Sequence, residues 1–200
     1  MKLDFAHAAL LEIDIQNDFC PGGALAVDKG DEVIAPLNAL ARCFAQKDAK
    51  VIATQDWHPE GHSSFASAPA QGPWPDHCVG GSFGAAFHEK LDLKPAHLII
   101  RKGFRQNLDS YSAFFENDRE TPTGLAGFLA GLSIDTVVLG GLATDYCVLY
   151  SALDARRLGL KTIVLLDAVR GVGLPEGSVE KALKQMEEAG VILTESAALT

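Results

Sequence analysis

The hydrophobic pattern of the chain combines two periodicities, which together predict an α/β fold. Short apolar runs typical of buried strands lie at residues 8–15, 50–54, 97–102, 136–141, 161–166 and, more weakly, 191–194. Between most of these runs, helical spacing predicts helices at 33–44, 125–132, 145–158 and 179–186. Strands that alternate with helices are typical of parallel sheets covered on both faces. We therefore expect one domain over residues 1–200, with a doubly wound, mostly parallel sheet of about six strands.

One segment departs from this alternation. Residues 56–96 are rich in proline, glycine, histidine and serine and have no clear period. A loop of this length in a compact domain is usually functional or disordered. We expect it to be a metal-binding or active-site loop.

Composition and charge exclude some classes of binding partner and indicate the cellular compartment. The 200 residues carry a formal net charge of -9, and lysine and arginine form no basic stripe, so nucleic acid and membranes are not expected partners. The first apolar stretch contains Asp4, Glu12 and Asp14, which argues against a signal peptide or membrane anchor. The four cysteines form no CxxC pair, which favours free thiols in a reducing cytoplasm.

Chemically active side chains follow four of the predicted strands. Asp14 follows the first, Asp56 and His58 the second, Lys102 ends the third, and Cys147 comes shortly after the fourth. Ligands of open α/β sheets bind beyond the carboxyl ends of the strands. Convergence of a carboxylate, an imidazole, an ammonium group and a thiol there favours an active site over a binding-only module.

Cys147 has two interpretations. A lone cysteine in an α/β protein is most often a small buried apolar residue. In GGLATDYC (140–147), however, an N-cap at Thr144 would place the thiol in the first turn of a helix, where the N–H groups and the dipole favour a thiolate. Lys102 would add a second cation, and Asp14 could carry the proton between the thiol and a leaving group.

The long loop contains candidate metal ligands. Asp56 and His58 are two residues apart, His77 lies 19 residues further on, and His62 is nearby. Such ligands suit zinc, iron or manganese. The alternatives are a polar, histidine-rich loop, or a local aromatic cluster that holds the loop down, formed by Trp57, Phe65, Trp74 and Phe83.

These residues belong to motifs that resemble the nicotinamidase (pyrazinamidase) family of isochorismatase-like cysteine hydrolases. The resemblance runs from near the N-terminus to at least Val169, with the motifs in family order: DIQNDFCPGGALAV (14–27), TQDWHPEGHSSF (54–65), WPDHCV (74–79), RKG (101–103), DSYSAF (109–114) and GLATDYCV (141–148). Together they are highly specific, whereas GLAT alone would indicate only the wider superfamily.

The resemblance implies a role for each matching residue. It implies a catalytic triad of Asp14, Lys102 and Cys147, and metal ligation by Asp56, His58 and His77, with His62 as a candidate fourth ligand. It also implies aromatic walls at Phe19 and Trp74, and a pocket residue at Tyr111. A cis peptide at Leu142–Ala143 would direct the N–H groups of Ala143 and Cys147 toward an oxyanion.

The activity implied is metal-dependent hydrolysis of nicotinamide to nicotinate and ammonia, and of pyrazinamide, through a Cys147 thioester in NAD salvage. The resemblance implies one divalent metal ion, zinc first, with iron or manganese as alternatives, and leaves room for a homo-oligomer. Two other functions stay open: another amidase or ureido-hydrolase of the superfamily, and a hydrolase whose nucleophile is metal-bound water.

Glu12 departs from the family pattern, which mostly has an aliphatic residue at this position of the first strand. A buried carboxylate is costly unless it is paired. The sequence identifies no partner for it, although the position is not part of the implied triad.

Overall fold

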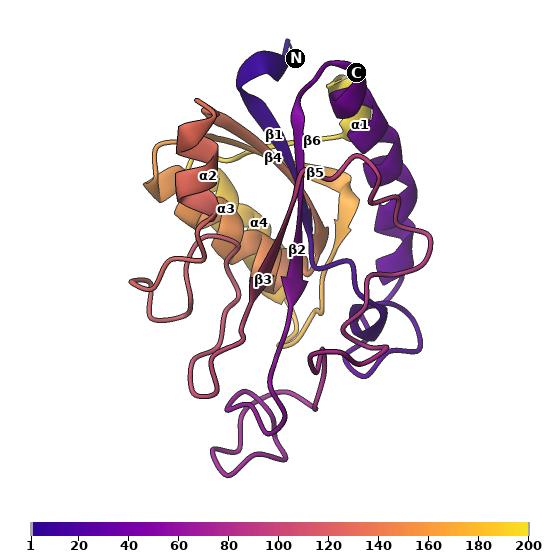
Figure 1. The fold of residues 1–200 in the computed structure, drawn as a ribbon, viewed down its shortest axis with the longest axis vertical. Coiled ribbons are helices and arrows are strands. Elements are labelled where there is room, and N and C mark those ends of the chain that lie inside the picture. Colours follow the sequence, from indigo (N-terminus) through magenta and orange to yellow (C-terminus); the bar gives the residue numbers. More distant parts are fainter. Residues whose placement is uncertain (1, 200) are drawn as a thin grey trace.

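Six apolar runs of the computed structural model, which describes residues 2–199, form the strands of one parallel sheet (Figure 1). They are β1 (Ala8–Ile13), β2 (Lys50–Asp56), β3 (Leu98–Lys102), β4 (Thr136–Leu142), β5 (Lys161–Arg170) and β6 (Ile192–Thr194). Their order across the sheet is β3-β2-β1-β4-β5-β6. The central strands β1 and β4 are buried along their whole length, which explains why their sequences are apolar without alternation.

Within residues 2–199, four α-helices cover the two faces of this sheet (Figure 1). On one face, α1 (Ile34–Gln46) packs its apolar side against Leu10 and other residues of that core. The opposite core includes Leu11 and Ile13 together with residues of α2 (Leu125–Gly131), α3 (Leu149–Arg157) and α4 (Ser178–Glu188). The predicted doubly wound α/β fold is therefore confirmed.

Two predicted elements differ from the structure by more than the one or two residues seen at the ends of the others. The strand predicted at 161–166 continues to Arg170, past the more exposed residues Leu166 and Asp167, because its pairing with β4 resumes at Gly141 after a register shift. The helix predicted at 145–158 is divided into a π-helical turn, Thr144–Val148, and α3. Ala143, and not Thr144, occupies the N-cap position, and no side chain caps the turn.

The strand order positions the site. After β1 the chain moves outward to β2 and β3, and it then returns to β4 on the other side of β1. A reversal of this kind opens a crevice at the carboxyl ends of the two central strands. Asp14 and Ala143 directly follow β1 and β4 there.

The long segment between β2 and β3 first extends beyond the carboxyl end of β2 and then runs back beside α1 (Figure 1), where the Asn38 side chain bonds to the backbone of Lys90 and Asp92. Isolated bridges from His58 to Val79 and from Phe65 to Trp74 fold it back on itself. The alternative of one aromatic cluster is wrong, because the Phe83 side chain is 83% exposed whereas Phe65 is fully buried. Among the described residues, no helix is both long and apolar enough to cross a membrane.

Candidate active site

Lys102 lies at the centre of the buried polar residues at the carboxyl ends of the strands. Its Nζ lies 2.8 Å from Asp14 Oδ2, contacts Asp56 Oδ1, and donates to the Ser110 carbonyl at 2.9 Å. The same Nζ is 3.5 Å from Cys147 Sγ. Strand order brings these groups together, because Lys102 ends β3, Asp56 ends β2 and Asp14 follows β1.

The opposite charges of Lys102 and the nearby carboxylates offset part of the cost of burying the charged groups. Burial lowers the pKa of Lys102, but Asp14 and Asp56 raise it by more, so the ammonium group stays charged. Burial likewise favours neutral Asp56, yet Lys102 and the neighbouring histidines hold its pKa well below the ordinary value. Sequence reasoning placed Asp56 with the metal ligands only; its contact with Lys102 links the two groups of residues.

Asp14 is the second fully buried member of this group. The Thr54 hydroxyl donates to Asp14 Oδ1 at 2.6 Å and accepts from the Asp14 backbone N–H at 3.1 Å. Burial raises the pKa of Asp14, and the charge of Lys102 only partly opposes that effect. A carboxyl group with a raised pKa close to a thiol can both accept and return a proton.

The Cys147 thiol differs from the sequence expectation. Burial raises its pKa well above the usual value, Lys102 opposes this, and the negative charges of Asp14 and Asp56 add to it. The expectation that the helix start and Lys102 keep the thiol ionised is therefore wrong, because desolvation outweighs them.

The two glycines before Ala143 are explained by packing. At Gly141, with φ +121°, a Cβ atom would lie 2.1 Å from the Ile13 carbonyl oxygen of the neighbouring strand. At Gly140 a Cβ would lie 2.7 Å from the Leu37 side chain of α1. Beyond these glycines, the Leu142–Ala143 peptide bond is cis, as the resemblance implies.

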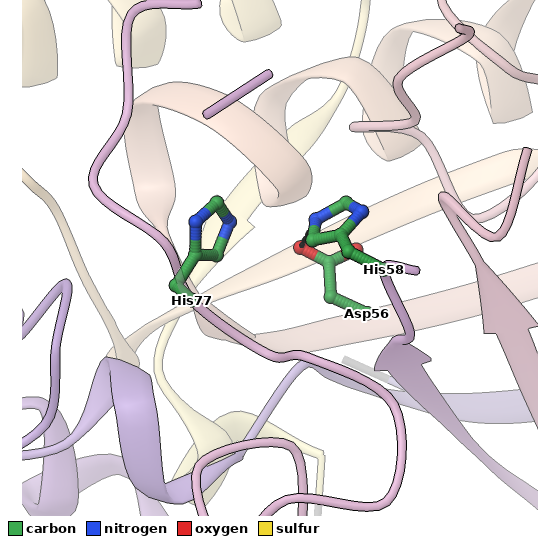
Figure 2. A group of neighbouring side chains, drawn as sticks. All are labelled: Asp56, His58 and His77. Atoms are coloured by element: carbon green, nitrogen blue, oxygen red, sulfur yellow. Dashed lines mark ion pairs between the residues drawn. The ribbon is translucent and has the colours of Figure 1, made fainter. Parts of the chain in front are cut away.

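Asp56, His58 and His77 form a group that fits a divalent metal ion. Their ligand atoms all lie within 4.8 Å of one another, and Figure 2 shows the His77 ring beside the Asp56–His58 pair. His58 Nδ1 donates to the Gly103 carbonyl and His77 Nδ1 to the Pro75 carbonyl, each at 2.8 Å. Both histidines thus present Nε2 as the ligand atom, an arrangement common around protein metals.

The His58 environment supports this fit. Its Nε2 is buried without a hydrogen-bond partner, which is costly for a polar atom unless a ligand satisfies it. Gly103, with φ +66°, passes so close that a Cβ there would lie 2.5 Å from the His58 ring. Phe65 packs edge-on against the rings of both His58 and His77 and restricts their rotation.

The structure does not group His62 with those three ligands. Its ring stacks on His58 with a centroid separation of 4.3 Å, and its Nδ1 lies 2.7 Å from Ser64 Oγ. His62, His58 and Asp109 form a second group of candidate ligand atoms, which shares His58 with the first. Ligation by His62 therefore stays a prediction.

A small pocket beside Cys147 collects the predicted substrate-binding residues. It is lined by Phe19, Leu25, Asp56, Trp74, His77, Asp109, Tyr111, Ala143, Tyr146, Cys147 and Val172. Trp74 Nε1 donates to the Tyr111 hydroxyl at 3.1 Å, and the Tyr146 ring lies edge-on to Trp74 at 4.9 Å. A flat ring could enter beside these aromatic side chains.

Sequence reasoning missed four lining residues: Leu25, Asp109, Tyr146 and Val172. Tyr146 directly precedes Cys147 and Asp109 begins DSYSAF, so their motifs offered a signal. Val172 lies outside the motifs, so the sequence offered no signal for it. Its loop is held by Asp145, a residue distant in the sequence. The Asp145 carboxylate accepts hydrogen bonds from the backbone N–H groups of Val172 and Gly173, both at 2.9 Å.

Comparisons with known proteins agree with this arrangement. The Isochorismatase domain model matches residues 8–198. A nicotinamidase of Acinetobacter baylyi is 46% identical, covering 92% of this chain and 91% of the relative. An Acinetobacter baumanii nicotinamidase/pyrazinamidase structure has a TM-score of 0.91 at 44% identity, covering 98% of this chain and 99% of the other.

A pyrazinamidase of Pyrococcus horikoshii, solved in complex with zinc, has a TM-score of 0.84 at 39% identity, covering 94% of this chain and 99% of that one. The range matched by the family model, residues 8–198, spans every strand of the sheet and the site described above. The chain therefore belongs to the isochorismatase family, within its nicotinamidase/pyrazinamidase branch.

Proposed function

We propose that this chain is a metal-dependent nicotinamidase that hydrolyses nicotinamide to nicotinate and ammonia, and also pyrazinamide, in NAD salvage. One observation carries the proposal: Lys102 Nζ contacts Asp14, Asp56 and Cys147 beneath a pocket lined by aromatic rings. The similarity to nicotinamidases and pyrazinamidases supports the choice of substrate.

Substrate binding uses the pocket and the metal group. The pyridine ring lies between Phe19 and Trp74, and Tyr111 borders it and fixes Trp74 through their hydrogen bond. A divalent ion held by Asp56, His58 and His77, zinc in our proposal, would when bound supply a coordination position for the ring nitrogen. The carboxamide then faces Cys147.

The first half of the reaction forms a thioester. Asp14 accepts the thiol proton as Cys147 Sγ attacks the carboxamide carbon, and the carbonyl electrons move onto oxygen. The backbone N–H groups of Ala143 and Cys147 hold that oxyanion. When the carbonyl re-forms, the C–N bond breaks and Asp14 gives its proton to the departing ammonia.

The second half reverses these proton transfers. Asp14 takes a proton from water, whose oxygen attacks the thioester carbon. The C–S bond then breaks, the proton on Asp14 returns to sulfur, and the nicotinic acid formed gives its remaining proton to solvent as it leaves as nicotinate. Lys102 stays charged throughout and holds the Asp14 carboxylate near Sγ. The raised pKa of Cys147 requires this assisted deprotonation in place of a preformed thiolate.

Substrate selectivity tests this function. Nicotinamide and pyrazinamide should be turned over well, whereas benzamide, which has the same shape without a ring nitrogen, should have a kcat/KM lower by roughly 10- to 100-fold. Loss of one strong polar contact costs about 1.5–3 kcal/mol, and ring stacking adds only about 0.5–1.5 kcal/mol.

Ammonia release by the metal-loaded enzyme measures this difference. Trp74→Ala should lower kcat/KM for all ring substrates together. Removal of the metal by a chelator should lower kcat/KM mainly for the substrates that have a ring nitrogen. Equal kcat/KM values for benzamide and nicotinamide would show that the ring nitrogen makes no selective contact. Failure to hydrolyse any of these amides would refute the proposed function itself.

A second prediction concerns metal stoichiometry. The purified protein should bind one divalent ion per chain, and a His58→Ala, His77→Ala double variant should lose it, since only the Asp56 carboxylate remains of the three ligands. Elemental analysis measures the content. The His7→Ala, His88→Ala double variant, whose residues lie outside the group, is the matched control. Full occupancy in the first variant would mean that the site is misplaced.

A further inference from the structure

The two carboxylate oxygens of Asp14 have different surroundings, although the whole residue is buried. Oδ1 accepts a hydrogen bond of 2.6 Å from the Thr54 hydroxyl. Oδ2 lies 2.8 Å from Lys102 Nζ, but it makes no hydrogen bond of normal geometry with any of residues 2–199. Buried polar atoms normally have such a partner. The open position on Oδ2 is therefore unusual, and it can receive a proton.

The Cys147 thiol lies close to this carboxylate. A carboxylate oxygen of Asp14 and Cys147 Sγ lie within 4.8 Å of each other. Lys102 Nζ is 3.5 Å from Sγ and 2.8 Å from Oδ2, so one ammonium group borders both the thiol and the open oxygen. Oδ1, by contrast, is already occupied by the Thr54 hydroxyl.

Thr54 also holds the backbone of Asp14. Its hydroxyl accepts from the Asp14 N–H at 3.1 Å, so a single hydroxyl bonds to both the main chain and the side chain of one residue. Asp14 has a φ of +49°, a left-handed conformation that few residues other than glycine adopt. The Thr54 hydroxyl therefore fixes the carboxylate and the backbone turn that carries it.

The place of Thr54 in the sheet suits this role. It is fully buried in β2, the strand beside β1, and Asp14 directly follows β1. A β-branched side chain has few χ1 rotamers, so burial within a strand holds the hydroxyl in one direction. Thr54 begins the motif at 54–65, but none of the roles implied by the resemblance falls on it.

We propose that Thr54 is a positioning residue that occupies Asp14 Oδ1 and thereby makes Oδ2 the oxygen that exchanges a proton with Cys147 Sγ. The S–H bond breaks as an O–H bond forms on Oδ2, and the hydrogen bond from Thr54 to Oδ1 stays in place. The effect on turnover rests on the proposed function. The effect on the thiol proton does not, because the reactivity of Cys147 can be measured without substrate.

The test compares Thr54→Val, which keeps the branched shape without the hydroxyl, with Thr54→Ser, which keeps the hydroxyl. In the metal-loaded enzyme, Thr54→Val should lower kcat for nicotinamide by roughly 10- to 100-fold, the scale of one lost hydrogen bond to a charged group. KM and zinc content should change little, because Thr54 belongs neither to the pocket lining nor to the metal group. Thr54→Ser should regain most of the lost activity.

Thr162→Val is the matched control. Thr162 is fully buried in β5, and its hydroxyl donates to the Leu160 carbonyl at 3.1 Å, outside the site. The same loss of a buried hydroxyl there should leave kcat at the wild-type value.

Alkylation by iodoacetamide provides the second readout. The rate at Cys147 is followed by mass spectrometry of its peptide, with the half-buried Cys43 as an internal reference. Alkylation requires loss of the thiol proton. The rate at Cys147 should therefore fall in Thr54→Val and recover in Thr54→Ser, whereas the rate at Cys43 should be the same in all variants.

Unchanged kcat and unchanged Cys147 alkylation in Thr54→Val would overturn the proposal. A Thr54→Ser variant as impaired as Thr54→Val would also overturn it, because packing of the γ-methyl group would then explain the loss. If Thr54→Val does not fold, Thr54→Ala gives the same comparison with Thr54→Ser. A wild-type protein that hydrolyses no amide, but whose Cys147 alkylation follows the expected order, would refute the proposed function and leave the role of Thr54 intact.

Discussion

Cys147→Ala should lower kcat/KM for nicotinamide by roughly 10⁴-fold or more, the scale seen when a covalent nucleophile is removed. The thiol is nearly buried, lies 3.5 Å from Lys102 Nζ and lines the pocket. Alanine retains the Cβ atom, so the fold and the metal content should change little. Ammonia release, circular dichroism and elemental analysis measure the three properties.

Cys43→Ala is the matched control, because Cys43 is a half-buried free cysteine in α1, outside the site. Asp14→Asn should be nearly as inactive as Cys147→Ala, since an amide cannot accept the thiol proton. Near-normal turnover by Cys147→Ala would instead favour metal-bound water as the nucleophile.

The second large effect concerns stability and Glu12. This residue lies in central strand β1, is fully buried, and has no hydrogen-bond partner for either carboxylate oxygen. Its register partner in β4 is Gly140, next to which Leu37 of α1 lies. Burial, with a smaller contribution from the negative charge of Asp92, raises the pKa of Glu12 to about 8.

The raised pKa fixes the sign of the pH dependence. The folded state holds the Glu12 proton more tightly than the unfolded chain, in which the carboxyl group has a pKa near 4.5. The contribution of Glu12 to the free energy of unfolding is therefore complete below about pH 4.5 and is lost as the pH rises through 8. A difference of this size corresponds to about 5 kcal/mol.

Glu12→Gln isolates this contribution. We expect the free energy of unfolding of wild type, relative to that of Glu12→Gln, to fall by several kcal/mol between pH 5 and pH 9. Urea denaturation across this range measures it, and Glu187→Gln, at an exposed position of α4, is the control. Parallel pH curves for wild type and Glu12→Gln would show that Glu12 has an ordinary pKa in the folded state.

The sequence determined the elements and the candidate residues. The central part of each strand and helix could be predicted because burial on one or both faces imposes a local apolar pattern. The motif GGLATDYC likewise contained the turn and the cysteine within eight residues, and the structure places the cis peptide at Leu142–Ala143. Such features depend on neighbours in the chain, which a sequence displays directly.

Tertiary structure decided how those residues interact. Lys102 is 46 residues from Asp56 and 88 from Asp14, and only the order β3-β2-β1 lets one ammonium group contact both carboxylates. The separation of His62 from the Asp56–His58–His77 group likewise depends on the path of the loop. The Cys147 thiol was expected to be ionised because the helix start and Lys102 are evident in sequence, but desolvation is not. Burial of the thiol reverses that expectation, since loss of water outweighs one nearby charge.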